Sequence, residues 1–418
     1  MAAFPYTNSF WASPVAPRTP LGSATALADV VIVGGGYAGM SSAYYLKKAK
    51  PDLKVVLLEK DHIGFGPSGR NFGAVVPGLR ELRTALLGDI DLEEEKFVQQ
   101  WYLAARGELE RRIAEGGIEC EYRNEPILMQ ALDESTWEAQ KREAEILRAK
   151  GTPHLLLDAA AFRKAMAVPY QVYGGIVRTA WRAVQPFKLA RGLGEQLRAL
   201  GVTVHEATAV TDVDDRGSEV VVKTSDGGVV RAGKAVLAAN AYSQFLAPVA
   251  DMIFPRHSWV LATRPLADDV LNSLGFNAYK FAEDAGMTFY YTRIYKNRLL
   301  IGGGPASKGI FTPSTIDRTA DQDAEEYARV YDEMQRRFPQ LRGAEIEAAW
   351  GGPIDMTDNF MPIIKPLPGK PNLIACFGFN GEGLLNGNIS GKFVQGLVLG
   401  PGFVDADAER IRHYMARA

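Results

Sequence analysis

The feature that most constrains the fold is a glycine-rich turn between two apolar segments near the start of the chain. Residues 30–33 are wholly apolar, and residues 44–49 after the turn are predicted to be helical. Residues 54–58 form a second apolar run that ends at Glu59. Three glycines lie between the first run and the helix with G-x-G-x-x-G spacing, namely Gly34, Gly36 and Gly39. In such a unit one glycine permits a sharp turn, one admits a pyrophosphate, and one lets helix and strand pack closely.

The helix and the acid that follow this turn have separate chemical roles. A helix N-terminus presents free N–H groups and the positive end of a dipole, which together favour a phosphate group. Glu59 lies about 20 residues beyond the last glycine, where a carboxylate can accept hydrogen bonds from ribose hydroxyls. A purely structural glycine turn is the alternative, but it leaves the two strands, the helix and the acid unexplained. We therefore predict that residues 28–83 form a dinucleotide-binding unit.

Composition places the chain among ordinary globular proteins. Its 418 residues suffice for two or three domains, and 47% of them are hydrophobic. The formal net charge of −2 gives no reason to expect a nucleic-acid partner or an anionic membrane surface. No apolar run approaches the length that spans a bilayer, and residues 1–28 do not resemble a secretion signal. Cys120 and Cys376 suggest neither a disulfide framework nor a metal site, so we expect a reducing, cytoplasmic compartment.

Periodicity predicts how the remaining chain is organised. Helices are expected over residues 91–116, 134–150, 187–200 and 324–338, and another is expected to run from the loop at 378–383 through Leu399. Strands are expected at residues 202–204, 209–213, 219–224, 229–231, 234–239, 253–263, 287–303 and 373–377.

Two of these assignments bear on the architecture. The strand at 234–239 is predicted to return to the parallel sheet beside the first strand. The segments at 253–263 and 287–303 alternate like strands of a separate sheet. Residues 1–28 carry several prolines and are expected to form an extended surface arm, held by Phe4, Tyr6, Phe10 and Trp11.

Four segments resemble the flavoprotein amine oxidases of the D-amino-acid oxidase superfamily, especially its γ-glutamylputrescine oxidase-like branch. The aromatic, proline-bearing arm before Ala28 is similar to the N-terminal arm of that branch. Residues 63–73, with the sequence IGFGPSGRNFG, look like its second glycine motif, and residues 298–303 resemble its substrate-domain strand. Residues 350–353 with Pro362, followed by 378–383, resemble the C-terminal segment that closes over the flavin. The motif at 63–73 is the most specific of the four.

The resemblance implies FAD rather than NAD as the cofactor, and an α/β architecture. It implies an arm at 1–27 and a Rossmann-like FAD-binding domain with a parallel sheet, built from residues 28–85, 183–249 and 346–412. It also implies an α+β substrate or cap domain with a mixed sheet, built from residues 86–182 and 250–345. A nicotinamide dehydrogenase would not need the return of the chain to a second glycine loop at 378–383.

The resemblance also assigns residues to the cofactor. These are Gly34, Gly36, Gly39, Glu59, Ser68, Arg70, Asn71, Val210, Asn240, Gly381, Gly383 and Leu384. Glu59 would hold the adenosine ribose, and the backbone of Val210 would lie against the adenine. The glycines at 381–383 precede a predicted helix, a geometry that aims N–H groups at the flavin C2 carbonyl, where reduction places negative charge. The alternative for Arg70 is a solvated loop arginine.

The implied reaction is hydride loss to FAD from the carbon next to the nitrogen of a small amine, which leaves an imine that water hydrolyses. O2 or another acceptor would then reoxidise the flavin. This chemistry needs a neutral amine and good alignment more than a strong base, and we expect no catalytic triad. Candidate pocket residues are Arg256, His257, Tyr290, Tyr291, Arg293 and Glu382. Tyrosine rings suit a cationic amine, whereas His257 could equally be a structural strand histidine and Arg256 the partner of a nearby acid.

Two positions limit what the resemblance says about substrate and oxidant. Ile354 stands where amino-acid oxidases carry the arginine that binds the substrate carboxylate. A plain α-amino acid therefore fits less well, unless Arg256 or Arg293 supplies the charge. Leu299 and Leu300 stand where the sarcosine-oxidase branch activates oxygen with a lysine, which leaves a dehydrogenase open.

Other departures concern the flavin itself. Residues 350–357 contain no cysteine, and Arg70 and Asn71 stand where some relatives tether the flavin through a histidine. We therefore predict non-covalent FAD. Glu382 replaces a histidine that is common in this loop, and Phe72 replaces a glycine, so the substrate is expected to differ from that of the branch's namesake.

Four functions remain open at this point. The leading one is an FAD-dependent oxidase of a primary or secondary amine. The second is an FAD-dependent dehydrogenase or oxidase of an N-substituted amino acid, and the third is a flavin-binding protein without turnover. The fourth is a nicotinamide dehydrogenase. The sequence does not reveal the amine, the electron acceptor or the oligomeric state.

Overall fold

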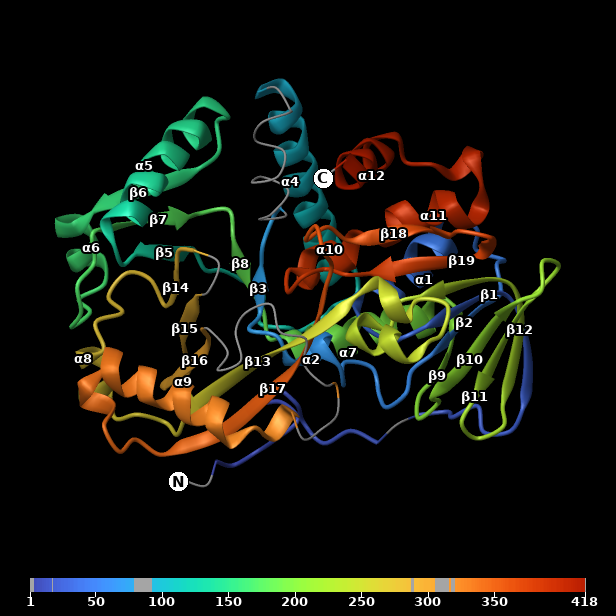
Figure 1. Ribbon diagram of the computed structural model, residues 1–418, viewed down its shortest axis with the longest axis horizontal. Coiled ribbons are helices and arrows are strands. Elements are labelled where there is room, and N and C mark those ends of the chain that lie inside the picture. The colour runs from blue at the N-terminus through green and yellow to red at the C-terminus, as the bar shows by residue number, and fades with distance from the viewer. Residues whose placement is uncertain are drawn as a thin grey trace. The chain divides into compact units, whose positions relative to one another are not determined.

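Two sheets organise the protein, and each forms the centre of a separate unit of the chain (Figure 1). The computed structural model describes residues 4–16, 18–78, 92–286, 289–304, 316 and 320–417. Unit 1 comprises the described parts of Met1–Phe10, Tyr122–Ala183 and His257–Gly352. Unit 2 comprises the described parts of Trp11–Glu121, Val184–Arg256 and Pro353–Ala418.

Unit 2 is built on a sheet whose centre is parallel. In spatial order its strands are β10 (Val210–Asp215), β11 (Val220–Thr224), β12 (Val229–Leu237), β1 (Thr25–Val33), β2 (Val55–Leu58) and β9 (Thr203–His205). β19 (Lys370–Phe377) and then β18 (Ile363–Leu367) extend the sheet from β12. β1 runs parallel to both β12 and β2, whereas β10 and β11 are antiparallel. The parallel sheet predicted from the sequence is therefore confirmed.

The long strand β12 explains why this sheet branches. Its first half pairs with β11 and with the start of β1, and its second half pairs with the end of β1 and with β19. The sequence predicted two strands here, at residues 229–231 and 234–239. The structure has one continuous strand, which ends at Leu237. In β1 only residues 30–33 are fully buried, so the apolar run in the sequence marks this half and misses residues 25–29.

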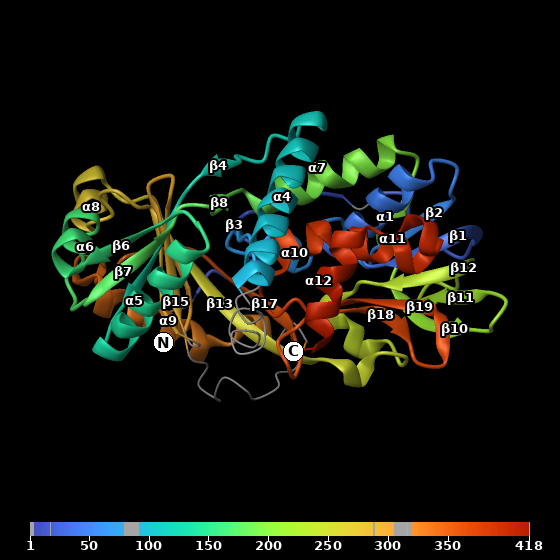
Figure 2. The same ribbon diagram turned by 90° about the horizontal axis from the view of Figure 1, so that it is seen from above.

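The helices of unit 2 include three that lie together beside this sheet. Within the described residues the helices are α1 (Tyr37–Ala49), α2 (Pro67–Arg70), α4 (Leu92–Glu115), α7 (Pro186–Ala199), α10 (Gly383–Ile389), α11 (Gly391–Leu399) and α12 (Ala406–Arg417). A 3-10 turn, η1 (Asn240–Phe245), follows β12, and the short strand β3 (Ala74–Val75) follows α2. α1, α10 and α11 lie side by side in both views (Figure 1 and Figure 2).

A serine of α1 explains why the C-terminal helix is interrupted. The sequence predicted one helix through Leu399, but α10 and α11 are separated at Ser390. Ser41 Oγ donates to the carbonyl oxygen of Asn388 (2.7 Å) and accepts from the amide of Gly391 (3.0 Å). A Cβ at Gly391 would lie 2.2 Å from the Ser41 carbonyl oxygen. The close approach of α1 therefore takes up backbone groups that a continuous helix would pair.

α4 belongs to unit 2, although residues 86–182 were expected in the cap; of these, 86–91 lie outside the described residues. The guanidinium of Arg112 in α4 is 3.9 Å from the ring centroid of Tyr44 in α1. It also donates to the carbonyl oxygen of Asn388 and to Oε1 of Gln196, each at 3.3 Å. A buried arginine thus joins α4 to three helices of unit 2. The spacing of apolar residues in α4 predicts which face is buried but not what covers it.

Unit 1 contains an eight-stranded mixed sheet, as the sequence predicted. Its strands in spatial order are β17 (Ile346–Met356), β13 (Phe254–Thr263), β16 (Arg298–Gly303), β15 (Tyr290–Tyr295), β14 (Phe281–Asp284), β5 (Ile127–Ala131), β7 (Gly174–Arg178) and β6 (His154–Asp158). β14 pairs in parallel with β5 and antiparallel with β15. The segment predicted at 287–303 is a hairpin of β15 and β16, and residues 287 and 288 lie outside the described residues. The division between the units falls within β13 and within β17.

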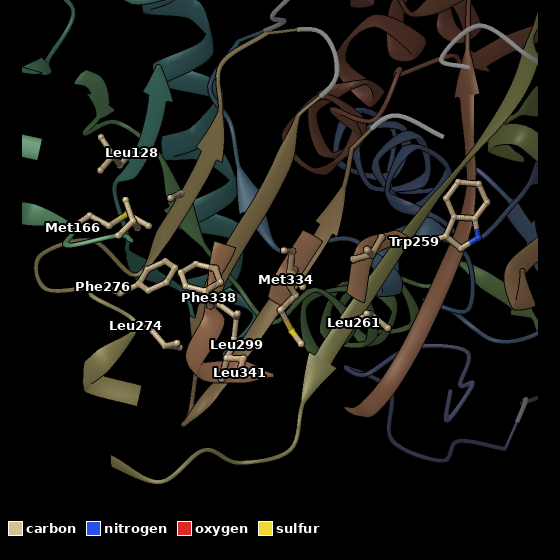
Figure 3. Close-up of a cluster of buried hydrophobic side chains, with 14 of the residues drawn as sticks. Leu128, Met166, Trp259, Leu261, Leu274, Phe276, Leu299, Met334, Phe338 and Leu341 are labelled. Atoms are coloured by element: carbon tan, nitrogen blue, oxygen red, sulfur yellow. The ribbon is translucent and has the colours of Figure 1, made fainter. Parts of the chain in front are cut away.

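One face of this sheet packs against α9 (Ala324–Arg337). The buried cluster on this face includes Trp259, Leu261, Leu299, Ile301, Tyr327, Val330, Met334 and Phe338 (Figure 3). Because side chains alternate along a strand, the residues between these strand positions lie on the opposite face. Part of that opposite face is covered by α5 (Glu134–Ala149), through a cluster of Met129, Ala144, Leu147 and Ile176. None of the described helices of either unit combines the length and apolar character needed to cross a membrane.

The remaining elements of unit 1 are short. The described ones are β4 (Arg123–Asn124) and β8 (Arg182–Ala183), which pair with each other, and α6 (Ala159–Ala165), α8 (Asp268–Ser273), η3 (Ala320–Gln322) and η4 (Pro339–Leu341).

The N-terminal arm is more deeply packed than a surface strap. Phe4 is buried, and its ring lies 5.7 Å from that of Tyr327. Phe10 stacks on Trp350 with ring centroids 5.8 Å apart. Tyr6, which the sequence also predicted to hold the arm, is exposed on one side and lies against Tyr327. Most of the predicted aromatic contacts are therefore present, but the first part of the arm is a component of the core of unit 1.

A buried ion pair lies inside the sheet of unit 1. The side chain of Arg293 on β15 is fully buried, and its Nη2 is 3.2 Å from Oε2 of Glu125, whose side chain is 8% exposed. Arg123 also contacts Glu125, at 2.7 Å. Burial lowers the pKa of Arg293, and the nearby Glu125 charge opposes this. Removing one partner of such a pair leaves the other charged and away from water.

We expect Glu125→Ala to lower the free energy of unfolding of unit 1 by about 3–5 kcal/mol, because Arg293 would remain buried without its carboxylate. Glu345→Ala is the matched control, since Glu345 pairs with Arg264 at the surface, where both side chains are more than half exposed. Its expected cost is below about 1 kcal/mol. Urea unfolding followed by circular dichroism measures both, and equal midpoints for the two variants would contradict the expectation.

Candidate functional site

The first glycine turn has the geometry that its spacing predicted. Gly34 has φ +109°, and a Cβ there would lie 2.4 Å from the carbonyl oxygen of Ala238 on the neighbouring segment. A Cβ at Gly39 would lie 2.0 Å from the carbonyl oxygen of Gly34, so the helix packs directly on the turn. At Gly36 the added Cβ would meet only Ser68 Oγ, at 3.1 Å, among the described atoms within 4 Å. Two of the glycines therefore serve packing, and Gly36 leaves its backbone open to a ligand.

The motif at 63–73 contains a second turn of the same kind. Gly64, Gly66 and Gly69 repeat the G-x-G-x-x-G spacing. Gly64 has φ +84°, and a Cβ at Gly69 would lie 1.9 Å from the Gly64 carbonyl oxygen. Gly66 precedes α2 with φ −74° and ψ −162°, close to the −78° and −179° of Gly36 before α1. The motif is therefore an internal repeat of the first glycine spacing, which its resemblance to a family motif did not reveal.

The two turns meet at a serine hydroxyl. Ser68 Oγ, in α2, accepts a hydrogen bond from the amide of Tyr37 (2.9 Å), the first residue of α1. No atom of the described residues would lie within 4 Å of a Cβ at Gly66. Open backbone at Gly36 and Gly66, next to a hydroxyl and a helix N-terminus, fits a phosphate-bearing cofactor such as FAD.

Glu59 lies where the sequence predicted an acid, directly after β2. Its Oε2 accepts from the amide of Gly35 (2.7 Å) and its Oε1 accepts from the amide of Asp61 (3.0 Å). Burial raises the pKa of Glu59, and these backbone bonds oppose the rise. Each carboxylate oxygen has a second lone pair, so both keep capacity for a ribose hydroxyl.

Arg70 and Asn71 both lie in the second turn, but their side chains make different contacts. Arg70 is buried, and its Nη2 donates to the hydroxyl of Tyr242 in η1 (3.2 Å), so it is not a solvated loop arginine. The Asn71 side chain bonds its own turn, since Nδ2 donates to the carbonyl oxygen of Pro67 (3.0 Å) and Oδ1 accepts from the amide of Gly73 (2.9 Å). The geometry supports Asn71 as a residue that shapes the turn.

The loop at 378–383 is held against the end of β17. Gly378 and Gly381 have φ +81° and +89°, and α10 begins at Gly383, as predicted. At Gly381 an added Cβ would approach only Ile354, at 3.9 Å. Leu384 is buried in α10, and Glu382 is half-buried at its start.

Val210 and Asn240 lie at opposite ends of the β10–β12 region. Val210 is the half-buried first residue of β10 and packs on the core of the sheet. Asn240 follows β12 at the start of η1 and has φ +51°, a left-handed conformation that non-glycine residues rarely adopt. Its Oδ1 is buried and has no hydrogen-bond partner among the described residues.

Strand alternation separates the pocket candidates of unit 1. His257 stacks beside Trp259 (ring centroids 5.9 Å apart), and its Nε2 is 3.1 Å from Oδ1 of Asp321, just before α9. The hydroxyl of Tyr290 accepts from Nη1 of Arg329 in α9 (2.8 Å). Both residues therefore lie on the face that packs against α9. Because adjacent strand residues point to opposite faces, His257 does not share a face with Arg256, and Tyr290 does not share one with Tyr291.

Tyr291 lies on the opposite face, with two polar residues that the sequence analysis missed. Its hydroxyl is 3.0 Å from Oγ of Ser258 on β13, and burial raises its pKa to about 12. The buried Glu283 on β14 is the direct cross-strand partner of Tyr291, and its charge adds to that rise. Alternation from Trp259 would have assigned Ser258 to this face. Glu283 lies in the short strand β14, to which the sequence analysis assigned no secondary structure.

The two arginines proposed for a substrate carboxylate have different surroundings. Arg293 shares the face of Tyr291, but its charge is compensated by Glu125, so a second role with substrate is not favoured. Arg256 is half-buried, and burial lowers its pKa. Alternation along β13 puts Arg256 on the same side of the strand as Ser258.

Comparison with known proteins agrees with this geometry. The sequence profile of the family described as FAD dependent oxidoreductase, DAO, matches residues 29–397. Gamma-glutamylputrescine oxidoreductase of Escherichia coli (strain K12) is 30% identical over 97% of this chain and 90% of its own length. Sarcosine oxidase subunit beta of Rhodobacter capsulatus is 23% identical over 83% of this chain and 79% of its own.

Solved structures show the same fold at lower identity. Glycine oxidase from Geobacillus kaustophilus superposes with a TM-score of 0.72 at 21% identity, covering 90% of this chain and 95% of that one. This likeness confirms the α/β architecture predicted from the sequence. The profile match covers nearly the whole chain and confirms the resemblance on which the cofactor assignment depended. The chain belongs to the DAO family of FAD dependent oxidoreductases.

Proposed function

We propose that this protein oxidises the C–N bond of a primary or secondary amine, with FAD as its cofactor. The observation that carries the proposal is the pair of similar glycine turns, joined through Ser68, in a chain of this flavin-dependent family. Names of relatives point the same way, since γ-glutamylputrescine and sarcosine appear in them. Family membership also decides for FAD against a nicotinamide cofactor.

The residues of unit 2 divide the work of holding FAD. Gly36 and Gly66 would admit the pyrophosphate, Ser68 would bond it, and Glu59 would accept from the adenosine ribose. Val210 at the start of β10 is proposed to lie against the adenine. The loop with Gly381 would lie against the flavin ring. When bound, FAD supplies the two-electron acceptor for a hydride from the substrate.

The amine would be recognised by the polar residues of the sheet face that carries Tyr291. A tyrosine ring attracts a cationic amine before it loses its proton, and the carboxylate of Glu283 has the complementary charge. Because its pKa is raised, the Tyr291 hydroxyl keeps its proton near neutral pH and can orient the substrate nitrogen. The roles of these residues are alignment and charge matching, which is what hydride transfer from a neutral amine requires.

A second candidate is the oxidation of an N-substituted amino acid. Arg256 favours it, because this half-buried arginine shares its side of β13 with Ser258 and could bind a substrate carboxylate. His257 is not proposed as a catalytic group in either case, since it pairs with Asp321 on the α9 side of the sheet. We propose a cytoplasmic location, and O2 or another oxidant as the terminal acceptor.

We expect Ser68→Ala to raise the dissociation constant for FAD roughly tenfold. The substitution leaves the amide of Tyr37 without its acceptor and removes one hydroxyl from the place proposed for the pyrophosphate. Ser225→Ala is the matched control, because Ser225 is exposed in the same unit and its hydroxyl donates to the neighbouring Asp226. Flavin fluorescence titration of the apoprotein measures both, and identical constants would contradict the role of Ser68.

We expect the purified protein to absorb near 450 nm, the usual band of oxidised flavin, and to bleach anaerobically with a substrate amine. The panel should contain polyamines and their acylated forms, N-alkyl glycines and plain amino acids. Bleaching by N-alkyl glycines but not by polyamines would favour the second candidate and Arg256. A yellow protein that no nitrogen compound bleaches would refute the proposed function, and peroxide release in air would identify an oxidase.

We expect the flavin to be held without a covalent bond, because residues 350–357 contain no cysteine and the buried Arg70 occupies the place of a tethering histidine. Precipitation with acid should release the yellow colour into the supernatant. The control is a flavoprotein with a known covalent tether treated in parallel. Colour retained in the washed pellet would contradict this expectation.

A further inference from the structure

A carboxyl group without a cation partner is buried beside the loop at 378–383. Asp355, near the end of β17, is 1% exposed. Its Oδ2 accepts from the amide of Gly378 at 2.5 Å, and the amide of Phe379 also bonds this carboxyl. Within the described part of the chain Asp355 has no ion-pair partner. Burial raises its pKa to about 7, although the backbone hydrogen bonds favour the charged form.

The backbone around Asp355 is tied to the same loop by further hydrogen bonds. The amide of Asn380 donates to the carbonyl oxygen of Asp355 (3.1 Å). In return, Oδ1 of Asn380 accepts from the amide of Thr357 (2.9 Å), and Nδ2 of Asn380 donates to the carbonyl oxygen of Gly378 (2.6 Å). The start of the loop thus has its position set by residues 355–357.

Asn240 provides a second partner that can respond to the charge on Asp355. Its side chain bonds the Asp355 carboxyl, and this bond favours the charged form. The Oδ1 of Asn240 is at the same time a buried acceptor with no partner among the described residues. A protonated carboxyl could donate to that oxygen after a half-turn of the amide, whereas a charged one cannot. The left-handed backbone of Asn240, with φ +51°, holds the residue at this place.

The other groups that face Asp355 do not compensate its charge. On β19 the nearest titratable group is the thiol of Cys376, whose pKa is raised to about 11, chiefly by burial and further by Asp355. The thiol therefore stays neutral near pH 7. From η1 the facing group is the amide of Asn240, and from the loop it is backbone N–H. A charged Asp355 is thus stabilised by hydrogen bonds alone.

We propose that Asp355 is a positioning residue for the loop at 378–383, and that its protonation, exchanged with solvent and shared with Asn240, sets how firmly this loop holds FAD. The proposal rests on the function proposed above, in which this loop lies against the flavin. In the neutral form no charge is buried, and the carboxyl can donate its proton to Asn240 Oδ1. In the charged form Asn240 Oδ1 is unsatisfied and a buried charge lacks a counter-ion, which destabilises the packed loop.

The dissociation constant for FAD, measured by fluorescence titration from pH 5.5 to 8.5, tests this. For the unaltered chain it should rise about tenfold, with a midpoint near pH 7. Asp355→Asn imitates the neutral carboxyl and should show a low constant that does not change with pH. Asp358→Asn, at an exposed position three residues along, is the matched control and should keep the full rise. Asn240→Ala removes the alternative acceptor and should reduce the rise.

A second measurement needs no cofactor. A carboxyl whose pKa is raised in the folded protein binds a proton there that the unfolded chain has lost above about pH 4. Stability is therefore lost as pH rises toward 7, and the loss levels off above it. The melting temperature of the apoprotein should fall between pH 5 and 7 more steeply in the unaltered chain than in Asp355→Asn. If Asp355→Asn folds too poorly to bind FAD, the melting temperatures of the apoprotein still test the proposal. Asn240→Ala can then replace Asp355→Asn in the FAD titration.

The outcomes separate the two proposals. A chain that binds FAD with the same pH dependence in the unaltered form and in Asp355→Asn would overturn the inference and leave the proposed function standing. The same holds if the apoprotein profiles coincide. A chain that takes up no FAD at any pH would overturn the proposed function, and the inference with it.

Discussion

Unit 2 depends on the packing of a glycine directly against a carbonyl oxygen, which occurs in both glycine turns. At Gly39 and again at Gly69 a side chain would come within about 2 Å of the carbonyl oxygen that opens the turn. Hydrogen is the only substituent that allows this approach, so each helix begins directly on its turn. The contact places Gly36 and Gly66 in matching extended conformations, and it brings Ser68 to the first amide of α1. The proposed cofactor residues follow from this packing.

Much of the fold of unit 2 could be predicted from the sequence, because glycine spacing and apolar runs are local signals. The turn at Gly34, the acid at Glu59 and the parallel return of β12 all follow from them. What could not be predicted depends on partners far apart in sequence. The periodicity of α4 gave its buried face, but Arg112 also bonds Asn388 of α10, which lies 276 residues further along the chain. Likewise, the residues next to Ser390 in the sequence do not indicate that contact with Ser41 ends α10 there.

The pocket candidates show a second limit on what the sequence alone can predict. Residue type suggested that His257, Tyr290 and Tyr291 belonged together, but a strand presents neighbours to opposite faces. Trp259 and Leu261 identify the face of the sheet that packs on α9. The residues of the opposite face then follow from the alternation of side chains along each strand. Ser258 and Glu283 lie on that opposite face together with Tyr291. Arg293 also lies there, but its charge is compensated by Glu125. The family resemblance thus suggested an amine, whereas strand register determines which side chains share a face of the sheet.

Ser41 has a consequence for the order of assembly. It joins the helix after the first glycine turn to residues about 350 positions further along. A ribosome adds residues over tens of seconds for a chain of this size, and domains form only when their parts have emerged. The first turn is therefore synthesised long before the segment that braces it. The bracing of α1 by Ser41 therefore forms only after residues 388–391 have been synthesised.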